Sequence, residues 1–154
     1  MKDSPQAKAT VQSNATDHPI ILYDGVCGLC NRLNQFVLRR DPGGIFRFVS
    51  LQSPLAAQIL DRHQKDPADL DTLYIVIHFD QPGESLLDRS DAAIFALKQI
   101  GGGWRIASSL AGLFPKTLRN FAYRLIARNR YRIFGRYETC MMPSPEYRAR
   151  FLDV

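Results

Sequence analysis

Residues 20–30 of the chain read IILYDGVCGLC and combine a strand pattern, a turn and a Cys-x-x-Cys motif. The first four residues are apolar and mostly β-branched or aromatic, as in a buried strand, and the Asp-Gly pair that follows signals a turn. From Cys27 onward, apolar residues recur at helical spacing up to residues 41–44, where Asp-Pro-Gly-Gly ends the pattern. We therefore expect Cys27 and Cys30 at the junction of a strand and a helix.

The rest of the first 100 residues predicts a sheet covered by helices. Strand patterns occupy residues 45–50, 73–78 and 85–88, and helical patterns occupy residues 53–64 and 90–100. Ser90 or Asp91 is expected to cap the last of these helices, which the glycines at 101–103 end. The order is βαβ followed by ββα, and parallel strands joined by a helix occur in sheets that helices cover. The predicted class is α/β.

Residues 104–137 are predicted to form a basic helical extension. Their apolar residues recur as one stripe, expected to cover the sheet and to break near Asn129; the stripe comprises Leu118, Phe121, Ala122, Leu125 and Ile126. Residues 1–100 carry 10 basic and 12 acidic side chains, whereas residues 101–154 carry 10 basic and 3 acidic ones. The net charge of +5 therefore belongs to the C-terminal end of the chain.

Length and composition favour one folded domain behind a flexible tail. A chain of 154 residues has the usual size of a single domain, and residues 1–17 are polar, aperiodic and broken by Pro5. The predicted division is a tail at 1–17 and a domain at 18–154. No apolar run approaches the roughly 18 residues of a membrane span, and the N-terminus lacks the apolar stretch of a secretory signal. We expect a cytoplasmic protein, in a reducing compartment where paired cysteines usually serve catalysis or metal binding.

The Cys-x-x-Cys motif is where we expect the chemistry. A cysteine at a helix N-terminus faces unpaired backbone N–H groups and the positive end of the helix dipole, which favour the thiolate, the nucleophile of disulfide exchange. Residues i and i+3 share a helix face, so the two sulfurs can approach bonding distance. Cys27 lies nearer the exposed loop, should be partly exposed, and is expected to attack a disulfide. Cys30 is expected to resolve the mixed disulfide. Asp24 either assists proton transfer, raises a cysteine pKa by charge repulsion, or only stabilises the turn.

Two other interpretations of the cysteine pair stay open at this point. The pair is also half of a zinc site, which would be completed by Cys140 and one of His18, His63 and His78, although the usual second pair of closely spaced ligands is missing. Alternatively, the two cysteines pack as small apolar side chains. Cys140 is either a third redox thiol or a buried spare one. The redox interpretation requires no bound cofactor, because the dithiol carries the electrons.

Together the motifs resemble one known family. Asp24-Gly25-x-Cys27-x-x-Cys30 after a strand is similar to the signature of the DCC-type thiol-disulfide oxidoreductases, which are named for that aspartate and those cysteines. The likeness continues through Asp88-Arg89-Ser90-Asp91-Ala92-Ala93, Gly103-Trp104, Pro115, residues 123–136 and Cys140-x-x-Pro143, and so covers about residues 19–152. The resemblance implies a thioredoxin-like fold with a C-terminal helical extension, a redox activity, and functional roles for Asp24, Cys27 and Cys30.

Two positions depart from the general thioredoxin pattern. Thioredoxins place a cis-proline just before the third strand, beside the dithiol, where it helps to present the substrate backbone; here Asp71 and Thr72 precede that strand. The dipeptide between the cysteines, Gly28-Leu29, also lacks the thioredoxin proline. We therefore expect substrate docking to differ from that of thioredoxins, or turnover to be slow.

The basic extension supports a second class of function. Its arginines, with tyrosines between them in residues 116–136, suit an acidic protein partner, and suit a nucleic acid or an anionic membrane surface less well. The rival interpretation is thus a non-catalytic basic binding module in which the cysteine pair is a zinc clip or a packing pair. The redox interpretation expects a protein or small-molecule disulfide as substrate and a separate reducing partner. It requires neither a nucleic acid nor a membrane span.

Overall fold

A computed structural model describes residues 18–66, 72–136 and 145–152. The predicted tail at 1–17 and Cys140 lie outside these residues. The strands are β1 (Ile20–Tyr23), β2 (Arg47–Ser50), β3 (Tyr74–Ile77) and β4 (Ser85–Asp88). The helices are α2 (Gly28–Arg40), α3 (Pro54–Arg62), α4 (Arg89–Ile100), α5 (Gly103–Gly112) and α6 (Lys116–Phe134), and a short 3-10 helix, η1, spans Arg148–Arg150.

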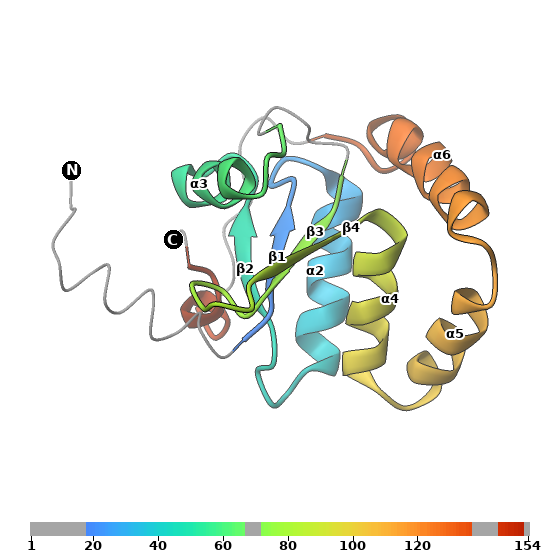
Figure 1. The fold of residues 1–154 in the computed structure, drawn as a ribbon, viewed down its shortest axis with the longest axis horizontal. Coiled ribbons are helices and arrows are strands. Elements are labelled where there is room, and N and C mark those ends of the chain that lie inside the picture. The colour runs from blue at the N-terminus through green and yellow to red at the C-terminus, as the bar shows by residue number, and fades with distance from the viewer. Residues whose placement is uncertain (1–17, 67–71, 137–144, 153–154) are drawn as a thin grey trace, which may run out of the picture.

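The four strands form one mixed sheet in the order β2-β1-β3-β4 (Figure 1). Strand β1 runs parallel to β2, with Ile21 opposite Phe48, and antiparallel to β3, with Ile21 opposite Ile75. Strand β4 pairs antiparallel with β3. The predicted βαβ unit followed by ββα is therefore confirmed. This mixed α/β arrangement is consistent with the thioredoxin-like fold that the family resemblance implied.

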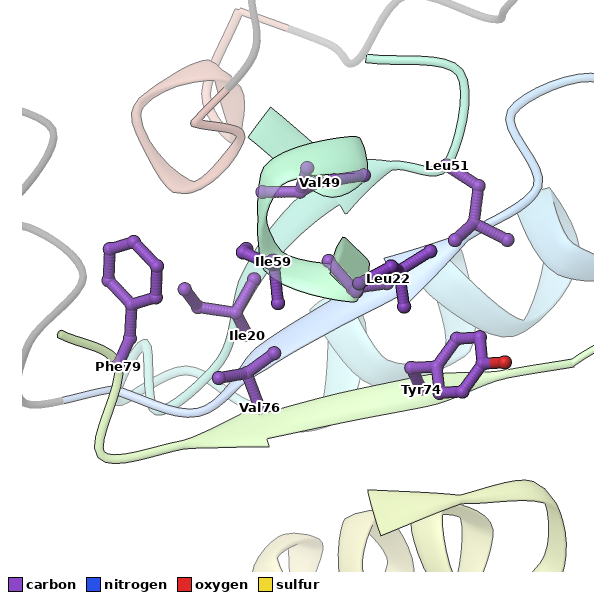
Figure 2. Packing of buried hydrophobic residues seen from close by; sticks show 10 residues of the cluster. Ile20, Leu22, Val49, Leu51, Ile59, Tyr74, Val76 and Phe79 are labelled. Carbon is purple, nitrogen blue, oxygen red and sulfur yellow. The ribbon is translucent and has the colours of Figure 1, made fainter. Parts of the chain in front are cut away.

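Alternate side chains of β1 pack into two hydrophobic cores, one on each face of the sheet. Ile20 and Leu22 point to the face that α3 covers, where Figure 2 shows them against Ile59 of that helix. Ile21 and Tyr23 point to the other face, which α2 and α4 cover. All four residues of β1 are buried, because both faces of the strand are covered. This burial explains why the sequence of the strand is apolar at every position. Its carboxyl end delivers the Asp-Gly turn to the edge of the sheet.

The start of β2 differs from the strand predicted at residues 45–50. The backbone N–H groups of Ile45 and Phe46 donate to the Asp41 carboxylate, at 2.9 and 3.0 Å, and the strand begins at Arg47. Asp41 in turn pairs with the Arg150 guanidinium, which comes from the last described stretch of the chain. At Ile45 and Phe46, the Asp41 carboxylate thus accepts the backbone hydrogen bonds that a neighbouring strand would otherwise accept.

The predicted cap of α4 is wrong. The helix begins at Arg89, and its N-cap residue, Asp88, makes no side-chain capping bond. Ser90 donates instead to the Asn120 side chain at 2.6 Å, and Asp91 forms ion pairs with two basic residues of α6. The two polar side chains expected to cap α4 therefore fasten α6 to it.

The basic extension folds as two helices, and two predictions about it are wrong. The chain breaks at residues 113–115, between α5 and α6, and α6 runs through Asn129 without interruption. The apolar stripe of α6 does not cover the sheet, since Leu118, Phe121 and Leu125 are each more than half exposed. Figure 1 shows both helices on the outer side of α2 and α4. No helix in the described part of the chain is long and apolar enough to cross a membrane.

Candidate active site

Cys27 is the N-cap residue of α2. Its backbone is extended (φ −80°, ψ 126°), and its sulfur accepts a hydrogen bond from the Cys30 backbone N–H at 3.3 Å. The Cys30 thiol also donates to this sulfur, and that bond is the main cause that lowers the pKa of Cys27 from an ordinary 9.0 to about 6. Burial opposes the shift, whereas backbone N–H groups of α2 and the charge of Arg130 assist it. Cys27 is therefore the thiolate of the pair at neutral pH.

Cys30 is the protonated member of the pair. Its hydrogen bond to Cys27 raises the pKa of the Cys30 thiol far above its ordinary value, and burial and the negative charge of Cys27 add to the rise. The exposure of Cys27 differs from the one expected from the sequence. Cys27 is completely buried, and Cys30 is partly exposed. The prediction of a partly exposed Cys27 is therefore wrong.

The end of α6 lies across the first turn of α2, next to Cys27. The Gly28 N–H donates to the Gly135 carbonyl at 3.1 Å, and Cys27 forms an isolated antiparallel bridge with Arg136. A Cβ atom at position 28 would lie 2.2 Å from the Phe134 carbonyl oxygen, so glycine alone permits this approach. Gly135 has a φ of 82°, which turns the chain out of α6 and over α2. We call residues 134–136 the cover segment.

Asp24, at the end of β1, is the buried anion of the site. Its Oδ1 accepts hydrogen bonds from the Val26 N–H at 3.2 Å and from the Gln52 amide at 2.6 Å. Its Oδ2 accepts from the Arg130 guanidinium at 3.2 Å and from the Tyr131 hydroxyl. The bond to Val26 is the turn-stabilising role considered from the sequence. Because four donors occupy the carboxylate, Asp24 holds other groups in place and has little freedom to act as a base.

Arg130 is the site residue that the sequence did not reveal. It lies in α6, 106 positions after Asp24, and is 3% exposed. Its charge lowers the pKa of both thiols, although it is a smaller influence than the hydrogen bond between them. In the sequence, Arg130 stands among arginines that suggested a binding surface. Two signals could have singled it out: the segment 123–136 belongs to the stretch that resembles the DCC family, and a buried aspartate needs a charged partner.

A cavity of about 370 Å³ opens between α2, α4 and α6. Cys30, Asp24 and Arg130 contribute to its lining, and Cys27 does not. Most of the remaining wall consists of apolar side chains, such as Leu33 of α2 and Ala93 of α4. The protonated thiol of the pair thus faces an apolar space that is large enough for part of a small organic molecule.

A family model and known proteins resemble this chain over most of its length. A family model described as DCC1-like thiol-disulfide oxidoreductase matches residues 21–136. The chain belongs to this family. One relative is the uncharacterized protein YuxK of Bacillus subtilis (strain 168), which is 38% identical over 133 residues, covering 86% of this chain and 93% of that protein. Another is the DCC family protein At1g52590, chloroplastic, of Arabidopsis thaliana, which is 32% identical over 122 residues, covering 79% and 68%. No solved structure matches the chain.

Other residues singled out in the sequence lie away from the dithiol of this DCC1-like protein or outside its described part. Cys140, which the zinc alternative requires, is not among the described residues. Within residues 18–66, 72–136 and 145–152, no group of three His, Cys, Asp or Glu side chains is arranged to hold a metal ion. His18 bonds to the Ile45 carbonyl at 3.0 Å, and His63 pairs with Glu84 at 2.7 Å. The membership in the family and the proximity of the two cysteines together support a redox function.

Proposed function

We propose that this DCC1-like protein is a thiol-disulfide oxidoreductase whose active pair is Cys27 and Cys30. The observation that carries the proposal is the contrast between the two thiols. Cys27 caps α2 as a thiolate, and Cys30, hydrogen-bonded to it, keeps its proton. A thiolate beside a protonated thiol is the reduced state from which disulfide exchange starts.

In the first step, the Cys27 thiolate attacks one sulfur of a substrate disulfide. A bond forms between Cys27 and that sulfur, and the other substrate sulfur leaves as a thiolate. Once Cys27 is bonded, its negative charge no longer opposes ionisation of Cys30. Cys30 gives its proton to the departing thiolate and attacks the Cys27 sulfur. A Cys27–Cys30 disulfide forms, the second substrate sulfur leaves as a thiolate that takes a proton from water, and the protein has lost the two electrons that the substrate gained.

The cover segment has to move before Cys27 can meet a substrate. Cys27 is completely buried, and residues 134–136 adjoin it through the Gly28–Gly135 hydrogen bond and the bridge to Arg136. One backbone hydrogen bond contributes only about 1 kcal/mol net, so its loss is a modest obstacle. We therefore propose that the substrate displaces this segment as it binds.

Asp24 and Arg130 act as positioning residues in this proposal. Their ion pair is buried, with 4% of the Arg130 side chain and 0% of the Asp24 side chain exposed. It holds the arginine charge near the two thiols, where it favours the thiolate form. The proton-transfer role considered for Asp24 is less well supported, because both carboxylate oxygens already accept hydrogen bonds.

The cavity beside Cys30 favours a disulfide with an apolar substituent as the substrate. Its walls are largely apolar, so the transfer of an alkyl or aromatic substituent from water into the cavity would favour binding. Asn34 also lines the cavity, and its Nδ2 is buried with no hydrogen-bond partner among the described residues. An amide or carbonyl oxygen on the substrate would satisfy this donor. A small-molecule disulfide or a peptide with apolar side chains beside the disulfide meets both requirements.

Titration against glutathione redox buffers, with alkylated thiols counted by mass, tests the function. We expect a reversible change of two thiols that disappears in Cys27→Ser, and its midpoint gives the direction of electron flow. The absence of a two-thiol transition, together with one metal ion per chain in the native mass, would instead establish the zinc-clipped binding module.

Trapping a mixed disulfide tests the roles within the pair. If Cys27 attacks, Cys30→Ser accumulates the adduct on Cys27, because the thiol proposed to resolve it has been removed. Cys27→Ser serves as the matched control, and we expect no adduct on its remaining Cys30. An adduct that forms on Cys30 in Cys27→Ser would reverse the assignment and make the partly exposed thiol the point of entry.

A further inference from the structure

Helices α5 and α6 turn large apolar side chains toward solvent. Of the eleven exposed large apolar residues in the described part of the chain, ten lie between residues 104 and 133. The exposed fraction is 52–81% for a set that begins in α5, includes the first residue after it, and continues in α6: Ile106, Leu110, Leu113, Leu118, Phe121 and Leu125. We call these six residues the apolar face. Exposed apolar surface gathered in one region marks an interaction surface.

Polar contacts on the opposite side of α6 fix this orientation. Arg130 is buried against Asp24, and Asn120 is buried against Ser90, whose hydroxyl donates to it at 2.6 Å. Phe121 lies nine residues before Arg130, about two and a half helical turns, and therefore on the opposite side of the helix. The α6 part of the apolar face cannot turn inward while the ion pair of Arg130 is intact. Its exposure is thus a consequence of how the active site is built.

Basic side chains accompany the apolar face, and acidic ones do not. Residues 101–137 contain eight Arg or Lys residues and no Asp or Glu. Arg124, Arg128 and Arg132 are exposed and follow one another at intervals of four, so they form a row along α6. Arg124 comes three residues after Phe121, and Arg128 three after Leu125, which places this row directly beside the apolar face.

We propose that the apolar face and the arginine row dock on the surface of an anionic membrane. A membrane interface offers an apolar phase for the leucines and Phe121 and a layer of phosphates for the arginines, side by side. A second copy of the chain fits poorly, because it would bring two arginine rows together with no acidic residue from 101–137 to pair with them. The three exposed arginines of the row keep α6 at the surface of the bilayer, where the helix lies along the interface.

Sedimentation with lipid vesicles tests the proposal and is independent of the dithiol chemistry. We expect the full chain to bind vesicles that contain phosphatidylglycerol, to bind pure phosphatidylcholine much less, and to be released by salt. Each arginine near an anionic surface contributes roughly fivefold to binding, so Arg124→Gln/Arg128→Gln should weaken it about 30-fold. Phe121→Asn/Leu125→Asn should weaken it at least tenfold, because the apolar area no longer enters the membrane.

A matched charge control is Arg62→Gln/Arg148→Gln. It removes two exposed arginines from α3 and η1, which Figure 1 shows near β2 and away from α6, and we expect binding to change less than twofold. Cys27→Ser should bind like the unchanged chain, which separates this test from that of the redox function.

Several outcomes would overturn the proposal. One is the absence of binding to phosphatidylglycerol vesicles at low salt. Another is binding that Phe121→Asn/Leu125→Asn leaves unchanged, which would mean unspecific charge attraction. A dimer in sedimentation equilibrium that this variant dissociates would show that a second copy covers the face. If the chain binds polyglutamate tightly and does not bind vesicles, the partner is an acidic protein.

Discussion

The low pKa of Cys27 is the most direct quantity by which the site can be tested. A thiol with a pKa of about 6 is roughly 90% ionised at neutral pH, whereas one at the ordinary 9.0 is roughly 1% ionised. The main cause is the hydrogen bond that the Cys30 thiol donates to the Cys27 sulfur. Replacing Cys30 with alanine removes this donor, and we expect the pKa of Cys27 to rise toward its ordinary value.

The rate of alkylation is a poor measure of this change. Thiolate nucleophilicity falls as the pKa falls, by about half a logarithmic unit per pKa unit. A drop from 9.0 to about 6 therefore raises the ionised fraction about 100-fold but lowers the reactivity of each thiolate about 30-fold, so the rate at neutral pH rises only about threefold. The burial of Cys27 slows the reagent further. The midpoint of the pH titration therefore measures the pKa of Cys27, whereas the rate of alkylation does not.

Thiolate absorbance in the far ultraviolet reports ionisation without a reagent that must reach the sulfur. Near pH 6, the difference between the titrations of the unchanged chain and Cys27→Ser reports Cys27, since Cys140 and the tyrosines are present in both and burial keeps Cys30 protonated in both. We expect a midpoint near pH 6 in this difference, and a clearly higher one for Cys30→Ala. A difference curve with its midpoint at the ordinary thiol value, or an equal midpoint in Cys30→Ala, would refute the assignment of the thiolate and of its cause.

Four other predictions have defined outcomes. Gly28→Ala places a Cβ 2.2 Å from a carbonyl of the cover segment, so we expect displacement of that segment and a several-fold faster alkylation of Cys27, measured by mass. Ala93→Phe fills the cavity and should lower kcat/KM for an apolar disulfide roughly tenfold to 100-fold, with glutathione disulfide affected less. Asp24→Asn leaves Arg130 buried without its anion and should cost about 3–5 kcal/mol in urea unfolding. In reduced protein, because the folded pKa of Cys27 is depressed, we expect the free energy of unfolding to rise from about pH 6 to pH 9, and Cys27→Ala to lack this rise.

Local sequence patterns were sufficient for the sheet and for the placement of the cysteines. The run at residues 20–23 is apolar throughout because both of its faces are buried, and the Asp-Gly turn after it fixes where α2 begins. The strand at 85–88 matches its predicted bounds as well. In each case the information lies within a few neighbouring residues, which is the range over which periodicity and turn signals act.

Contacts between distant residues were not visible in the sequence. The burial of Cys27 depends on the cover segment, more than 100 residues further along, and no local pattern links the two. The arginines of α6 look alike in the sequence, although Arg130 is buried and Arg128 is exposed. Periodicity did identify an apolar stripe on α6 but not the side that it faces, because the buried ion pair of Arg130 outweighs the tendency of apolar side chains to turn inward.

One buried ion pair accounts for three features of α6. Asp24 has to lie at the end of β1 because it holds the turn that leads to Cys27, and a carboxylate buried there requires a cation. Arg130 supplies it from α6, and this contact brings the end of that helix across α2, where the cover segment adjoins Cys27. The same contact fixes the rotation of α6 and so leaves Phe121 and its neighbours outside. Removing the Asp24 charge therefore affects the path of α6 across α2, the position of the cover segment and the rotation of the helix together. Substitutions on the outer side of α6 leave the ion pair intact. They alter the apolar face without altering the dithiol, whereas a substitution of Asp24 alters both.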